Sequence, residues 1–106
     1  MGFKLRFSAD FYSDLDDAMD YAVDILDSPG YAYDLWQNVY QKVDVIEGQP
    51  FLYPLYYHNE TIAAKGFRYA VVGDYLLFYR VIENDKIVRV ESLIHGKRNL
   101  SQVFTL

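Results

Sequence analysis

The chain has 106 residues, of which 52% are hydrophobic and 24% are charged. This composition excludes a disordered chain, and the length predicts one domain over residues 1–106 rather than two. Cysteine is absent, which excludes a disulfide framework, thiolate catalysis and a cysteine-ligated zinc site. No stretch approaches the roughly 20 apolar residues of a membrane span, and the first residues lack the apolar run of a signal peptide. We therefore expect a cytoplasmic protein without a membrane partner.

Charge is divided unevenly along the sequence. The formal net charge is −5, but residues 1–60 hold 3 Lys and Arg against 11 Asp and Glu, a balance of −8. Residues 61–106 hold 7 against 4, a balance of +3. The net charge argues against a nucleic-acid partner, because phosphates need exposed cations, whereas the basic second part keeps such a partner open. For the acidic part, a solvated helix face that only keeps the protein soluble is the simple alternative.

The first half of the chain predicts a strand and a pair of helices. Residues 3–7 alternate between apolar and polar, which is typical of a strand with one buried face. Apolar residues then recur at helical spacing to about Asp27, after Ser8 in the position of an N-cap. The Ser-Pro-Gly sequence at 28–30 either breaks the chain or begins the next helix, with its serine as the cap. That helix ends near Gly48, and the short connection predicts an antiparallel hairpin.

The second half predicts three strands after a loop. Residues 49–65 show no sustained period and are interpreted as a packed loop. Three β-rich runs follow, separated by tight-turn sequences, at 67–72, 75–82 and 86–95. The expected fold class is α+β, in the order β-α-α-β-β-β, with a small antiparallel sheet packed on an N-terminal helical hairpin.

One face of the last strand is the candidate working face. Simple alternation over 86–95 places Arg89, Glu91 and His95 on one face and the valines at 88 and 90, with Ile94, on the other. The cations expected to extend this face lie beyond the strand end or near the neighbouring strand: Lys97, Arg98, Lys65 and Arg68. We expect them to form one basic surface opposite the helical hairpin, and the alternative is that they are ordinary solvated strand residues.

Other kinds of chemistry have little support in the sequence. His58 and His95 are the only histidines, they lie far apart, and no carboxylate stands at ligand-like spacing to either. The serines lack the glycine pattern of a nucleophile elbow, and the glycine-rich patterns of phosphate and dinucleotide loops are absent. We therefore expect no metal and no cofactor. Most of the 11 tyrosines are assigned to the core.

Three strings, taken together, are similar to a known family. They are Phe-Arg-Tyr at 67–69, Gly-Asp-Tyr-Leu-Leu-Phe-Tyr-Arg-Val at 73–81 and Leu-Ile-His-Gly-Lys-Arg-Asn-Leu at 93–100. With the order of elements, they resemble the RelE/ParE superfamily of bacterial toxins over nearly the whole chain. The resemblance implies a type II toxin–antitoxin module, in which a partly disordered cognate antitoxin folds on the toxin and holds it inactive.

The resemblance implies two possible activities. RelE-like members cleave messenger RNA in the decoding site of the ribosome, and ParE-like members inhibit DNA gyrase without cleaving nucleic acid. We expect the first, a metal-independent endoribonuclease, somewhat ahead of the second. A degenerate member that keeps only a regulatory binding role is a third possibility.

The resemblance also suggests site residues. Arg98, in Gly-Lys-Arg, matches the cation that stabilises charge on the phosphate, and Arg68 and His95 complete the candidate catalytic set. Two positions depart from the RelE pattern, because Phe104 stands where that pattern has Tyr and Leu76 where it has Arg. The candidates for binding RNA or phosphate are Lys97, Lys65, Arg89, Arg80 and Phe104.

Overall fold

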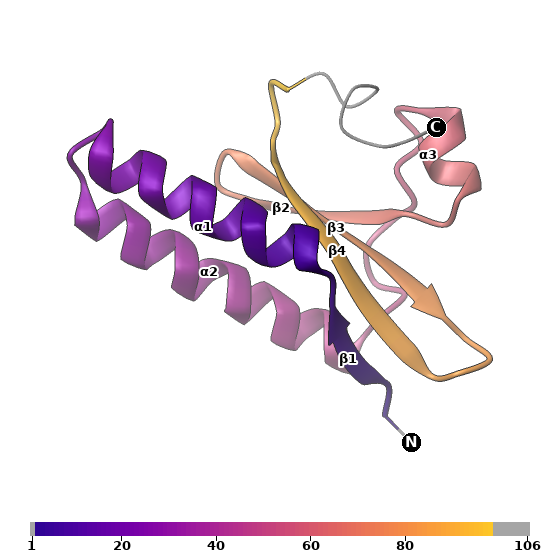
Figure 1. Cartoon of the computed structure of the whole chain (residues 1–106). Coiled ribbons are helices and arrows are strands. Elements are labelled where there is room, and N and C mark those ends of the chain that lie inside the picture. Colours follow the sequence, from indigo (N-terminus) through magenta and orange to yellow (C-terminus); the bar gives the residue numbers. More distant parts are fainter. Residues whose placement is uncertain (1, 99–106) are drawn as a thin grey trace.

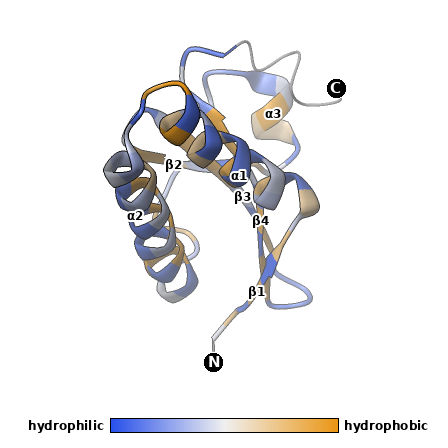
Figure 2. Ribbon diagram, turned by 60° about the vertical axis from the view of Figure 1, so that its left-hand side comes forward, coloured by the Kyte–Doolittle hydropathy of each residue, from blue (hydrophilic) through white to orange (hydrophobic). Residues whose placement is uncertain are grey.

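The computed structural model describes residues 2–98, which form a helical hairpin against one face of a four-stranded sheet (Figure 1). Figure 2 shows from the side that the two long helices lie together and that the short third helix stands apart from them. No helix within 2–98 has the length and apolar character to cross a membrane. The elements are β1 (Lys4–Phe7), α1 (Ala9–Asp24), α2 (Pro29–Gly48), α3 (Glu60–Ala64), β2 (Arg68–Val72), β3 (Tyr75–Ile82) and β4 (Ile87–His95).

Serine caps begin both long helices. The Ser8 hydroxyl accepts a hydrogen bond from the Phe11 amide, and Ser28 does the same at the start of α2. The sequence at 28–30 is therefore a helix start. Helix α1 ends three residues before the expected Asp27, because that residue has φ 51°, which a right-handed helix excludes.

The sheet has the order β1-β4-β3-β2. β2, β3 and β4 form the expected antiparallel meander, and β1 pairs in parallel with β4, so the sheet as a whole is mixed. A parallel neighbour needs a crossover, and the helical hairpin provides it. The fold class expected from the sequence is confirmed.

The two faces of the sheet bury unequal cores. The hairpin face carries the large one, in which Phe11, Leu35 and Val39 pack on Leu77 and Val90. The opposite face, called here the outer face, carries a small cluster of Ile62, Phe78 and Ile94. Ile62 belongs to α3, which lies in the segment expected to be a loop. Its signal is a capping Asn59 before an acidic first turn, over a stretch too short for a period to appear.

A β-bulge changes the expected facing of β4. Phe78 pairs with Ser92 and Tyr79 with Val90, so Glu91 is an extra residue in β4. Beyond the bulge the alternation is reversed: Ile94 joins the outer cluster and Leu93 joins the hairpin core. The prediction that His95 shares a face with Arg89 is therefore wrong.

Candidate site on the outer face of the sheet

Three arginines stand side by side across the outer face. Arg6 of β1 is in register with Arg89 of β4, which is in register with Arg80 of β3. Their chain neighbours point into the hairpin core, so the arginines themselves point the other way. With strands about 4.8 Å apart, this arginine rung spans roughly 10 Å.

Glu91, the bulge residue, holds two members of the rung. Its Oε2 accepts from Arg80 Nε at 2.6 Å and its Oε1 from Arg89 Nε at 3.0 Å, and its side chain is only 12% exposed. The Arg80 guanidinium also lies over the Phe67 ring, 5.3 Å from the centroid. Pairing both arginines through one carboxylate fixes their geometry and leaves the rung with an excess of positive charge.

Arg6 completes the rung without a carboxylate partner among the described residues. It is exposed, and its Nη1 donates to the neighbouring Leu5 carbonyl at 2.9 Å. Sequence analysis missed it, because the parallel pairing of β1 with β4 that brings it beside Arg89 leaves no local pattern. Arg6 is therefore the arginine of the rung whose charge is not paired with a carboxylate of residues 2–98. An anion that approached the rung would form its first ion pair with Arg6.

The other predicted site residues lie elsewhere. Arg68 is on the hairpin face, where its Nη1 donates to the Tyr53 carbonyl at 2.7 Å and its guanidinium lies over Phe51. Lys65 is exposed at the C-terminal cap of α3. Phe104 lies outside the described residues.

The end of β4 is remote from the rung. The six steps along the chain from Arg89 to His95 extend over roughly 20 Å. The His95 ring packs against Tyr75 on the hairpin side, with centroids 5.3 Å apart, and its Nδ1 accepts from the amide of Lys97. Lys97 and Arg98 are exposed in the turn that follows. The expected single basic surface is therefore divided, with Arg80 and Arg89 brought together and His95 apart from them.

Asp14 shows where the charge of Arg98 acts. Burial raises the pKa of the Asp14 carboxyl, while the hydrogen bond from the Leu93 amide, at 3.0 Å, and the positive charge of Arg98 act in the opposite direction. Asp14 belongs to α1, so the charge of Arg98 acts on a carboxyl of the helical hairpin. No group of three or more histidines and carboxylates within 2–98 is arranged to hold a metal ion.

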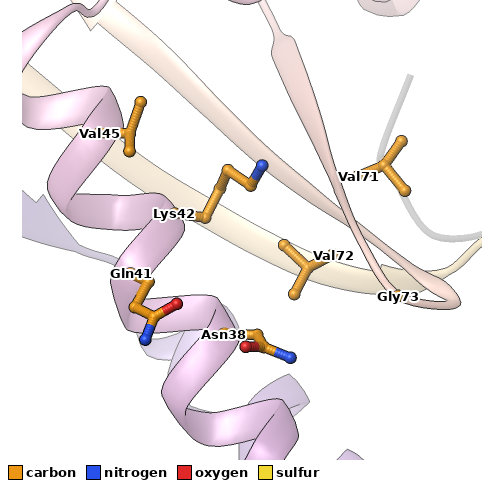
Figure 3. A pocket seen from close by; sticks show the side chains of 7 residues that line it. All are labelled: Asn38, Gln41, Lys42, Val45, Val71, Val72 and Gly73. Carbon is orange, nitrogen blue, oxygen red and sulfur yellow. The ribbon is translucent and has the colours of Figure 1, made fainter.

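A cavity of about 340 Å³ separates α2 from the edge strand β2 (Figure 3). A second cavity, of about 420 Å³, is lined in part by the same residues, Asn38, Val72 and Gly73. The two cavities are therefore adjacent along α2. The loop at Pro54–Tyr56 pairs with the start of β2, so the part of this edge strand that is offered to a partner is its Val71–Gly73 end, which borders the recess. The first cavity is lined by Asn38, Gln41, Lys42, Val45, Val71, Val72 and Gly73.

Comparison with known proteins identifies the family. A search of curated proteins finds no match. Among solved structures, a chromosomal ParDE TA system from P. aeruginosa superposes with a TM-score of 0.70 at 18% identity, covering 88% of this chain and 95% of that one. The RelBE2 toxin–antitoxin complex from Mycobacterium tuberculosis gives 0.53 at 17% identity, covering 90% and 99%. These likenesses concern the fold. The family model of the ParE toxin of type II toxin–antitoxin systems, parDE, matches residues 5–100, and the chain therefore belongs to that family.

Proposed function

We propose that this toxin stops growth by binding DNA gyrase and does not itself cleave RNA. The supporting observation is the separation of the side chains that cleavage requires. Arg80 and Arg89 lie on the outer face, His95 lies on the hairpin side, and Arg98 follows the end of β4. Cleavage needs a proton-transfer group within hydrogen-bond reach of the phosphate that the cations hold. The described carboxylate at the rung, Glu91, has each oxygen engaged by an arginine.

The test is a pair of assays on the purified toxin. We expect inhibition of DNA supercoiling by gyrase, and intact messenger RNA after incubation with programmed ribosomes. Cleaved message together with unimpaired supercoiling would overturn the proposal. Both targets are cytoplasmic, and we place the protein there.

Ribosome-dependent cleavage of messenger RNA is the second candidate, and the arginine rung favours it because a polynucleotide backbone suits a row of cations. If it is the activity, Arg98→Ala lowers the single-turnover rate about 10²- to 10³-fold, as expected for the loss of one charge-stabilising donor. Phe104→Tyr raises the rate, because a phenol can exchange a proton and a phenyl ring cannot. If the toxin acts on gyrase, neither the parent nor either variant cleaves the message.

The proposal includes a cognate antitoxin as the partner that holds the toxin inactive. The two solved relatives are toxin–antitoxin assemblies, and the recess beside β2 suits an added strand. We expect the product of the adjacent reading frame to copurify with the toxin and to protect the amides of β2 from hydrogen exchange. Copurification without protection of β2 would refute the docking position and leave the partnership intact.

A further inference from the structure

A continuous row of aromatic rings runs from α2 across the edge strand β1 to α1. On α2, Tyr33 stacks on Trp36, with centroids 6.5 Å apart, and Trp36 contacts Tyr40 at 5.2 Å. Tyr40 contacts Phe7 of β1 at 6.3 Å, and Phe7 contacts Tyr12 of α1 at 5.6 Å. These five residues, called here the aromatic seam, connect α2, β1 and α1, and two of them, Phe7 and Tyr40, also pack on the large core.

The seam is too exposed to serve only the core. Tyr33 is 58% exposed, Tyr12 49% and Trp36 44%, and Val23, also exposed, extends the apolar surface along α1. Exposed apolar surface of this kind marks interaction sites, and Trp and Tyr are the residues that most often dominate binding energy.

Acidic residues border the seam on both helices. Asp16 and Asp20 follow Tyr12 at one and two helical turns, and Asp44 follows Tyr40 at one turn. Burial raises the pKa of the Tyr40 hydroxyl on α2, and the charges of Tyr12 and Asp16 on α1 add to the effect. Figure 2 shows hydrophilic turns along both helices.

Basic residues do not offset this border. Lys42 is the one basic residue in the sequence between positions 8 and 48, and its Nζ lies over the Tyr53 ring, 5.2 Å from the centroid. Lys42 also lines the recess beside β2. The seam therefore combines a rigid apolar centre with a negative rim.

This combination selects among possible occupants. A second copy of the chain, docked face to face, would bring its own acidic rim against this one, and like charges across an interface are costly. A nucleic acid is repelled for the same reason. Lysine and arginine side chains, in contrast, pair with the aspartates and also lie favourably over Trp and Tyr rings.

We propose that the aromatic seam docks a basic amphipathic helix of a partner protein. The apolar stripe of that helix packs on Trp36 and Tyr33, and its cations meet Asp16 and Asp20. The inference does not rest on the proposed function, because none of the residues that support that function belongs to the seam.

The test uses two synthetic amphipathic helices with the same leucine stripe, one with lysine and the other with glutamate at every polar position. Trp36 is the only tryptophan, so its emission reports directly on the seam. We expect the lysine peptide to shift that emission saturably and the glutamate peptide to leave it unchanged. Equal binding of the two peptides, or no binding of the lysine peptide, would overturn the proposal.

Substitutions place the binding on the seam. By calorimetry, Trp36→Ala weakens the lysine peptide at least about 30-fold, as for a hot-spot residue. The double change Asp16→Asn/Asp20→Asn weakens it roughly 3- to 10-fold, as for two exposed ion pairs. The matched control, Asp10→Asn/Asp17→Asn, exchanges two exposed aspartates that lie about 90° around α1 from Asp16 and Asp20, and it leaves affinity unchanged. The inference is contradicted if the control pair loses as much affinity for the lysine peptide as the Asp16/Asp20 pair. It is also contradicted if the free toxin self-associates and Trp36→Ala abolishes that self-association.

Discussion

Tyr79 is the largest side chain that the fold buries completely. Its hydroxyl donates to the Pro50 carbonyl at 2.8 Å, which fixes the loop after α2 against the centre of β3. Tyr79→Phe leaves that carbonyl unpaired, and we expect the free energy of unfolding to fall by about 1–3 kcal/mol. Urea unfolding measures it, with Tyr57→Phe, at a 72% exposed site, as the matched control. Equal effects at the two sites would refute the role of the hydrogen bond.

The burial of Tyr79 also predicts that the fold is less stable at alkaline pH. Burial raises the pKa of Tyr79 from 10.0 to about 12, against the opposing charge of Arg68. Because the folded pKa exceeds the unfolded one, this stabilisation is complete below pH 10 and disappears as the pH rises through 12. We expect a fall of about 2–3 kcal/mol across that window, measured by urea unfolding. Tyr79→Phe has a shallower fall, and an identical pH profile for the two proteins would contradict the assignment.

At the scale of elements, the two serine caps are a natural matched pair. Ser8 accepts from Phe11 and also donates to the carbonyl of Glu91, whereas Ser28 has only its capping bond, to Tyr31. Ser28→Ala is expected to cost about 1 kcal/mol of unfolding free energy. Ser8→Ala costs about 1–3 kcal/mol more, because it also leaves the bulge carbonyl unpaired. Equal losses in thermal or urea unfolding would show that Ser8 acts as a simple cap.

Asp14 joins α1 to β4 through the Leu93 amide. Its raised pKa means that the fold favours the protonated carboxyl, so the contribution of Asp14 to stability is lost as the pH rises through its folded value. Asp14→Asn keeps an acceptor without the buried charge, and we expect it to be at least as stable as the parent at pH 7. Asp14→Ala is expected to lose about 1–3 kcal/mol, because the amide is unpaired.

Comparison of the two variants by urea unfolding at neutral and acid pH tests this role. The advantage of Asp14→Asn over the parent should shrink as the pH falls and the parent carboxyl becomes protonated. Equal stability of Asp14→Ala and the parent at pH 7 would mean that the hydrogen bond is unimportant.

The elements that sequence predicted are those with a repeated period or an explicit boundary signal. Residues 3–7 and the stripes of α1 and α2 repeat often enough to be identified, and the turns at Gly73-Asp74 and 83–85 separate the strands. A bulge adds one residue without changing composition, so alternation alone could not place Glu91. This missed bulge also made the prediction of the site wrong, because it put His95 on the same face as Arg89.

At the scale of the whole molecule, the site depends on long-range pairing. Arg80 and Arg89 were identified because they lie in adjacent strands of a meander, whose pairing follows from the turns. Arg6 belongs to the same rung through β1, which is far away in the sequence, and nothing local signals that contact. Arg68 was misplaced because it pairs with Tyr79, whose side chain lies in the hairpin core, so Arg68 points to the same face and donates there to the Tyr53 carbonyl.

The two unequal cores predict unequal stability. The outer cluster consists of three buried residues, and one of them, Ile62, is its link to α3. β3, in contrast, lies between two strands and contributes to the large core. We expect the hydrogen-bonded amides of Ala63 and Lys65 to exchange by local opening at much lower free energy than those of β3. Native-state hydrogen exchange tests this, and identical opening energies would show a single cooperative unit.

The parallel pairing of β1 with β4 also determines how late in translation the fold can be completed. β1 is made first, but its only partner strand begins at Ile87, and the hairpin core is completed by the same strand. At about 5–20 residues per second, a ribosome needs several seconds to pass from one strand to the other. During this interval the nascent chain has no complete sheet and no assembled arginine rung. The cell therefore has a delay, built into the topology, in which an antitoxin already present can meet the toxin as it folds.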